Sequence, residues 1–60
     1  MRTEYTIMRT DFARCRTSRH MGISFAKFAT KTEAWWATMA KIAQLNAAAG
    51  EDTFFWVKYQ

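Results

Sequence analysis

Four anion-binding side chains lie close together in the 60-residue chain: Arg14, Arg16, Arg19 and His20. A guanidinium donates hydrogen bonds through a planar fork, which fits the two oxygens of a carboxylate or a phosphate. Lysine would serve solubility equally well, so the choice of arginine favours recognition of an acidic partner. That partner is either an acidic protein surface or a nucleic acid. A solvated turn that only keeps the chain soluble is the alternative.

The positive charge belongs to the first half of the chain. Residues 1–31 carry seven basic and two acidic side chains, whereas residues 32–60 carry two basic and three acidic ones, and the net charge is +4. An asymmetry of this kind indicates a surface that attracts acidic partners.

Cys15 and His20 are a nucleophile and a base, but the chain lacks the other parts of a catalytic site. No third group orients the base, no glycine-rich loop offers an oxyanion hole, and a chain this short leaves little room for a water-excluding pocket. A metal ion needs three or four converging ligands, which one cysteine and one histidine do not supply. The sequence therefore predicts no enzyme activity, no metal and no cofactor. The single cysteine also excludes an intramolecular disulfide and fits a reducing compartment.

The C-terminal segment predicts a strand with large apolar side chains on both faces. Because strand residues alternate, Phe55, Val57 and Tyr59 share one face, and Phe54 and Trp56 share the other. The chain has one predicted helix, and one helix covers one face. Phe54 and Trp56 therefore need a second partner.

Three kinds of partner fit an uncovered face lined by Phe12, Phe54 and Trp56, with Met8 and Phe28 as further candidates. Aromatic side chains beside arginines stack bases in RNA-recognition folds, although the glycine-aromatic signature segment of that family is absent here. A homodimer would bury the same face, and a domain this small gains most from oligomerisation. The face also has the composition of a contact site for another protein.

Trp36 is a separate candidate contact on the helix. It lies beside a smooth column formed by Ala40, Ala43 and Ala47, which would let a partner helix or sheet edge approach closely. Alternatively, these alanines serve only their high helix propensity, and Trp36 folds over the edge of the sheet.

Two strands are expected before the helix. Residues 3–16 alternate imperfectly, which predicts a strand with a bulge or bend near Met8–Asp11. Residues 16–20 are polar and predict the hairpin connection. Residues 21–29 then predict the second strand, with small side chains on one of its faces.

The helix is predicted over Lys31–Ala49. Thr30 and Glu33 form a capping box at its start, and Gly50 supplies a left-handed residue at its end. The apolar stripe that contains Trp35, Met39 and Ile42 is expected to face the sheet.

These elements predict a single α+β domain over residues 1–60, in two layers with ββαβ order. A mainly antiparallel three-stranded sheet of order 2-1-3 would carry one helix on one face. The same element order occurs among small phage-encoded inhibitors of host enzymes, a likeness of topology alone.

The sequence thus predicts a small non-enzymatic protein that docks on an acidic surface of a host or cellular protein. It would act by steric occlusion, as an inhibitor or accessory factor of phage or mobile-element type. Nucleic-acid binding is the alternative, and a homodimer is compatible with both. The expected contact residues are Arg14, Arg16, Arg19, Trp36, Phe54 and Trp56. No apolar run approaches the ~18–20 residues of a membrane span, so no membrane partner and a cytoplasmic location are expected.

Overall fold

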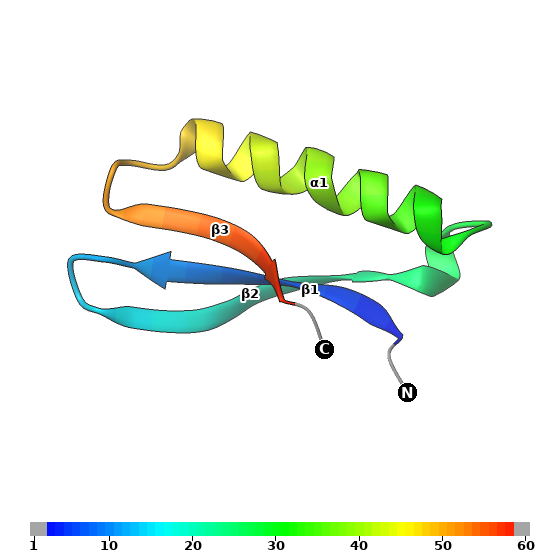
Figure 1. Cartoon of the computed structure of the whole chain (residues 1–60), viewed down its shortest axis with the longest axis horizontal. Coiled ribbons are helices and arrows are strands. Elements are labelled where there is room, and N and C mark those ends of the chain that lie inside the picture. Colours follow the sequence, from blue (N-terminus) through cyan, green and yellow to red (C-terminus); the bar gives the residue numbers. More distant parts are fainter. Residues whose placement is uncertain (1–2, 59–60) are drawn as a thin grey trace.

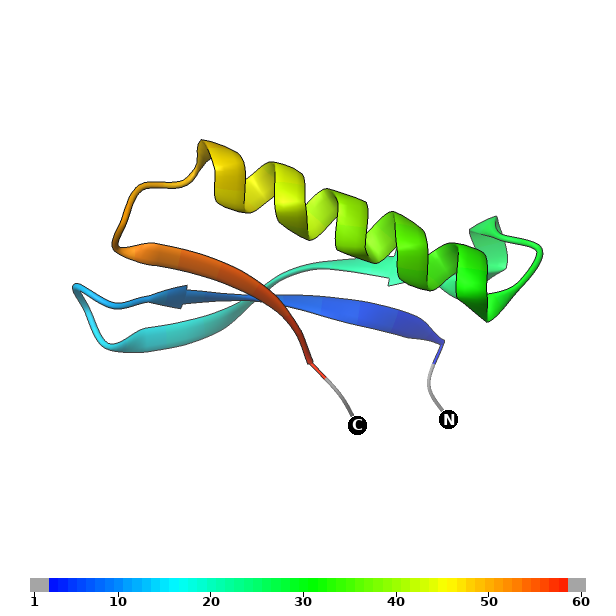
Figure 2. The same cartoon turned by 45° about the horizontal axis from the view of Figure 1, so that its top comes forward.

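Three antiparallel strands form one sheet, and a single helix packs on one of its faces (Figures 1 and 2). The structure is a computed structural model that describes residues 3–58. Its elements are β1 (Glu4–Asp11), β2 (Arg16–Ser24), the short 3-10 helix η1 (Phe25–Lys27), α1 (Lys31–Ala48) and β3 (Thr53–Lys58). The sheet order is β2-β1-β3. The predicted α+β fold, ββαβ order and sheet order are confirmed; the position expected for Tyr59 lies outside the described residues.

The hairpin turn lies earlier than the sequence predicted. The chain turns at residues 12–15, because the Asp11 side chain accepts a hydrogen bond from the Arg14 amide at 3.3 Å and Cys15 adopts a left-handed conformation with φ 52°. Aspartate at the start of a turn commonly makes this bond. The segment 16–20, predicted as the connection, instead forms the exposed first half of β2. Arg16, Arg19 and His20 are therefore strand residues.

A bulge interrupts the β1–β2 pairing. Ile7 pairs with Met21, but Met8 pairs with Arg19, which leaves His20 as an extra residue on β2. The irregularity was expected slightly further along, near Met8–Asp11, and in the first strand. It reverses the alternation of β2, so that Arg19 faces away from the helix.

The second strand also ends earlier than predicted, at Ser24 rather than Ala29. The Ser24 hydroxyl accepts a hydrogen bond from the Ala26 amide at 3.3 Å and so caps η1. This turn brings the ring of Phe25 to 4.8 Å from that of Tyr5 in an edge-to-face contact.

The helix begins as the sequence predicted. The Thr30 hydroxyl accepts a hydrogen bond from the Glu33 amide at 3.2 Å. The Glu33 carboxylate reaches back to the amide of Ala29 rather than to that of Thr30. The end differs, because neither described glycine has a positive φ and Gly50 is not a left-handed cap. Extended backbone at Ala49 instead leads the chain toward β3.

The core is small and lies between α1 and the middle of the sheet. Ile7, Ala34 and Thr38 have no exposed surface, and Phe55 retains 7%. The Thr38 hydroxyl is satisfied by donating to the Ala34 carbonyl at 2.7 Å. Small residues thus occupy the most buried line of the helix, where bulky ones would hold it away from the sheet.

The predicted apolar stripe lies to one side of that line. Trp35, Met39 and Ile42 are half-buried, so the helix is rotated relative to the expectation. The Trp35 ring lies 5.3 Å from the Tyr5 ring, so the large indole packs beside the buried line of the helix rather than on it.

Asn46 joins the helix to the outer edge of β3. Its side-chain amide donates to the Phe55 carbonyl at 3.0 Å, and its side-chain oxygen accepts from the Phe55 amide at 2.8 Å. Both backbone groups of Phe55 point away from β1 and are satisfied by this one side chain. The sequence pattern did not predict this bond.

Thr30→Ala is expected to lower the free energy of unfolding by about 0.5–2 kcal/mol, because the Glu33 amide loses its cap. Chemical denaturation measures the change. Thr32→Ala, also exposed in the first turn, is the matched control and should have a smaller effect. Equal midpoints for the two variants would contradict the capping role.

Asn46→Ala is expected to cost about 1–3 kcal/mol, because it leaves a part-buried amide and carbonyl of Phe55 unpaired. Hydrogen exchange should also accelerate at the Phe55 amide. Gln44→Ala, an exposed position on the same helix, is the control. An unchanged exchange rate at Phe55 would show that the bond does not persist in solution.

Candidate functional site

The face of the sheet opposite α1 carries the main candidate surface. The strand registers place Met8 and Thr10 of β1, Arg19 of β2, and Phe54 and Trp56 of β3 on this side. We call it the open face, because no helix or loop within residues 3–58 packs over it (Figure 2). Phe54 and Trp56 thus lie on the opposite face of the sheet from Phe55, as the sequence predicted.

Two aromatic rings near the hairpin end are strongly exposed. Phe54 is 49% exposed on the open face, and Phe12, in the turn directly after β1, is 57% exposed. The Phe12 amide donates to the Asp52 carbonyl at 2.7 Å, so the turn is tied to the segment that enters β3. Phe28 lies after η1 and is not part of the sheet, contrary to its suggested place beside these residues.

Trp56 is held across the sheet by a hydrogen bond. Its indole Nε1 donates to the Thr10 hydroxyl on β1 at 2.8 Å. The Thr10 and Thr17 hydroxyl oxygens lie 3.2 Å apart, which extends the polar contact to β2. The indole is therefore fixed in direction before any partner arrives, and little side-chain entropy remains to be lost on binding.

Arg19 lies on the open face in contact with an acidic residue. Its guanidinium nitrogen is 3.0 Å from the Glu4 carboxylate, which also accepts from the Thr6 hydroxyl at 3.3 Å. The carboxylate occupies space beside Gly22, where a Cβ atom would collide with it. Glycine at this position thus lets Glu4 orient Arg19, whose side chain stays 58% exposed.

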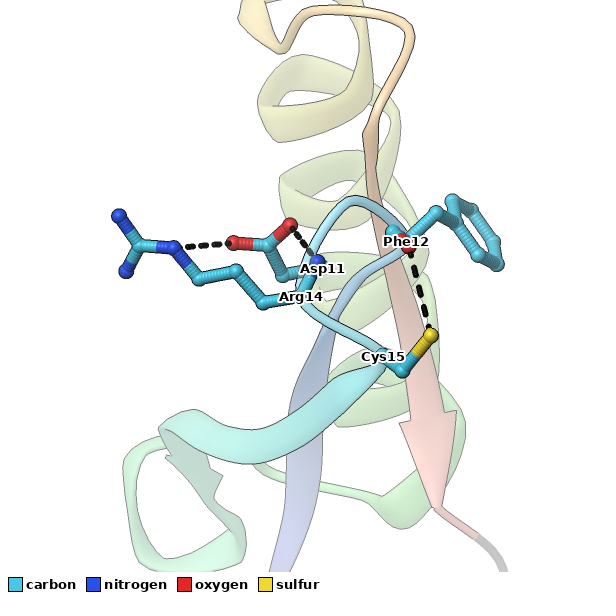
Figure 3. Close-up of polar contacts among 4 residues, drawn as sticks. All are labelled: Asp11, Phe12, Arg14 and Cys15. Carbon is cyan, nitrogen blue, oxygen red and sulfur yellow. Dashed lines mark hydrogen bonds and ion pairs between the residues drawn. The ribbon is translucent and has the colours of Figure 1, made fainter.

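Arg14 projects from the hairpin turn. Its Nε lies 3.8 Å from an Asp11 carboxylate oxygen, and its side chain is 77% exposed. Figure 3 shows the two terminal guanidinium nitrogens pointing away from Asp11, free to bind an anion. Phe12 and Arg14 leave the turn in opposite directions in the same view.

The arginines do not form the single cluster that the predicted hairpin connection implied. Arg16 pairs with Asp11 in the register, so it shares the helix side of the sheet with Arg9 and makes no ion pair with residues 3–58. Arg19 is on the open face and Arg14 in the turn. The basic residues are therefore divided between the turn and the two faces of the sheet and do not form a single anion-binding site.

Trp36 lies on the outer side of α1 and is 66% exposed. This position is opposite the buried line of Ala34 and Thr38, so Trp36 is on the other side of the molecule from the open face. One flat partner cannot contact both tryptophans. Trp36 is thus a second, independent candidate surface.

A groove that was not predicted from the sequence lies between the C-terminal end of α1 and the sheet. It has a volume of about 350 Å³ and is open to solvent. Its lining is Arg9, His20, Leu45, Ala48, Ala49, Thr53 and Phe55. The bulge turns His20 toward the helix side, where its ring lies 4.9 Å from that of Phe55. Such a groove depends on how the helix sits on the sheet, which local sequence does not encode.

The nucleophile and the base named from the sequence have unrelated contacts. The Cys15 thiol lies 3.8 Å from the Phe12 carbonyl in the turn (Figure 3). His20 instead packs on Phe55. In the described part of the chain no three histidine, cysteine or acidic side chains gather as a metal site would need. Nor is any described helix long and apolar enough to cross a bilayer.

No family model matches the chain, and comparison with curated proteins and with solved structures gives no match either. The fold and the surfaces described above are therefore the basis for a functional proposal.

Cys15→Gly is expected to stabilise the hairpin by roughly 1 kcal/mol, because glycine adopts the left-handed conformation without the Cβ contact. Denaturation under reducing conditions measures the gain. Cys15→Ala keeps the Cβ atom and should give no comparable gain. A similar stabilisation in both variants would trace the effect to loss of the thiol.

Proposed function

We propose that this chain is a small non-enzymatic binding protein that docks through its open face on an acidic surface of another protein. The exposed aromatic side chains carry this proposal. Phe54 and Trp56 lie on a sheet face that no other described segment covers, and Phe12 is exposed at its hairpin end. Large exposed apolar areas on a small domain mark binding sites.

The open face has the features of an energetic hot spot. Tryptophan and arginine are enriched among residues that dominate binding energy, and Trp56 and Arg19 occur together here. Each is held by a partner on the same face, Trp56 by Thr10 and Arg19 by Glu4. Such preorganisation raises affinity because fewer rotamers are lost on docking.

The positive charge supports an acidic target. Arg14 and Arg16 lie at the end of the molecule nearest to Phe54, and Arg16 has no ion pair with a described residue. Arg19 lies further along β2, on the open face. Complementary charge mainly accelerates encounter and orients the partners. The aromatic contacts then determine how long the complex lasts.

Steric occlusion is the mechanism that this arrangement favours. A rigid sheet can cover a functional surface of its target without any chemistry of its own. We place an inhibitor or accessory factor of phage or mobile-element type first, because small phage-encoded inhibitors share the element order. The cytoplasm is the compartment that fits the exposed free thiol of Cys15.

Nucleic-acid binding is the second candidate, and one observation favours it. The hydrogen bond to Thr10 directs the Trp56 indole across the open face of the sheet, an arrangement in which a base can stack on the ring. The arginines would then contact phosphates.

The decisive experiment is affinity capture from a host lysate with and without nuclease, followed by kinetics with the recovered partner. Phe54→Ala should increase the dissociation rate by about tenfold or more, as loss of an anchor does. Trp36→Ala removes an exposed aromatic from the opposite side and is the matched control. Faster dissociation only in Trp36→Ala would place the binding surface on the helix and contradict the proposal.

The other partners give different results. A nucleic acid is lost on nuclease treatment, and log affinity falls with log salt at a slope near −0.9 per duplex phosphate contact. A second copy of the chain on the open face gives a dimer by light scattering that Phe54→Ala dissociates. A protein partner survives nuclease and binds a monomeric chain.

A further inference from the structure

The two outer edges of the sheet differ in the hydrogen bonding of their backbone groups. On β3, Asn46 occupies both backbone groups of Phe55, and the Thr53 amide donates to the Gly50 carbonyl at 3.3 Å. On β2, no segment of residues 3–58 lies beyond the strand at its hairpin end (Figures 1 and 2). The β2 edge therefore offers free backbone donors and acceptors, as an unpaired strand does.

The register identifies which of these groups point outward near the end of β2. The Phe25 amide donates to the Thr3 carbonyl at 3.0 Å, so that pair is hydrogen-bonded across the strands. Because bonded and non-bonded pairs alternate, Ile23 also bonds to β1, whereas Gly22 and Ser24 direct their backbone groups outward.

The same reasoning applies on the other side of the bulge. The backbone groups of Phe55 point away from β1, so its partner Arg9 directs its own groups toward β2. Ser18, opposite Arg9, is then bonded inward. Thr17 and Arg19 accordingly present their amides and carbonyls at the free edge.

The side chains along this edge are basic. The segment from Arg16 to His20 is exposed throughout, and β2 contains two arginines, one histidine and no acidic residue. Pairing of β2 with a second copy of itself would bring two basic segments side by side, and like charges on adjacent strands are destabilising. The edge is therefore complementary to an acidic strand rather than to its own copy.

We propose that the outer edge of β2 binds an acidic, extended segment of another protein as a fourth strand. Main-chain hydrogen bonds to Thr17 and Arg19 would supply affinity, as in other cases of strand addition. Arg16 and Arg19 lie three residues apart on opposite faces of the sheet. A matching segment carries two acidic residues at the same spacing, so that each meets one guanidinium.

A defined peptide tests this inference. The probe is an acetylated and amidated strand-forming peptide of threonine and valine with two glutamates three positions apart. Titration into isotope-labelled protein should slow hydrogen exchange at the Thr17 and Arg19 amides. A peptide with lysines in place of the glutamates, and one N-methylated at two adjacent central residues to block both of its edges, should each bind at least about tenfold more weakly.

Matched variants of the protein separate backbone from charge. Thr17→Pro removes an outward amide that the β1–β2 ladder does not use, and Thr17→Val removes the same hydroxyl but keeps the amide. Only the proline variant should lose the peptide. Arg16→Glu should weaken binding more than Lys27→Glu, which changes the net charge equally but lies in η1, beyond the far end of β2.

Three results would overturn the inference: no binding of the acidic peptide at millimolar concentration, equal binding of its N-methylated form, or protection confined to β3. The peptide results do not depend on any variant folding correctly. They can also be told apart from the proposed docking face: Arg19 belongs to both surfaces, but Phe54→Ala alters the open face alone and should leave peptide binding unchanged.

Discussion

A single helix can cover only one face of a sheet, and the rest of this structure depends on that limit. Ala34 and Thr38 are small, so they let the helix pack close to the sheet. Both are fully buried, as is Ile7, and the core within residues 3–58 is small. Within residues 3–58, no further layer packs against the aromatic side chains on the far side of β3. Stability and binding capacity therefore have the same origin, because the helix that buries Phe55 leaves Phe54 exposed.

Asn46 extends this asymmetry from the faces of the sheet to its edges. By bonding to both backbone groups of Phe55, it ties the helix to β3 and also occupies the outward donor and acceptor at the middle of that edge. No equivalent side chain serves β2 among the described residues. A single polar residue thus fixes the position of the helix and determines which edge of the sheet remains available.

Local sequence predicted what local interactions decide. The Thr30–Glu33 pattern located the start of the helix, and strand alternation placed Phe54 and Trp56 opposite Phe55, since both depend on neighbours in the chain. The bulge at His20 was not predicted, because it depends on how β1 and β2 align along their whole length. The Asn46 bond and the rotation of the helix arise from contacts between distant segments. For the candidate site, the residue types were recognisable from the sequence, but their division among two faces, a turn and a helix was not.

The dispersal of the arginines determines what their charge can do. Arg19 is paired with Glu4, Arg14 approaches Asp11 at 3.8 Å, and Arg16 lies on the other face of the sheet, so no site holds one anion between them. Arg16 and Arg19 lie three residues apart on β2, about 10 Å along the strand, which is close to the Debye length of about 8 Å at physiological salt. Charges on both faces therefore contribute to one positive potential around the hairpin end. Such a field attracts an acidic partner from a distance, while the fixed indole of Trp56 and the exposed ring of Phe54 supply the short-range contacts that distinguish one partner from another.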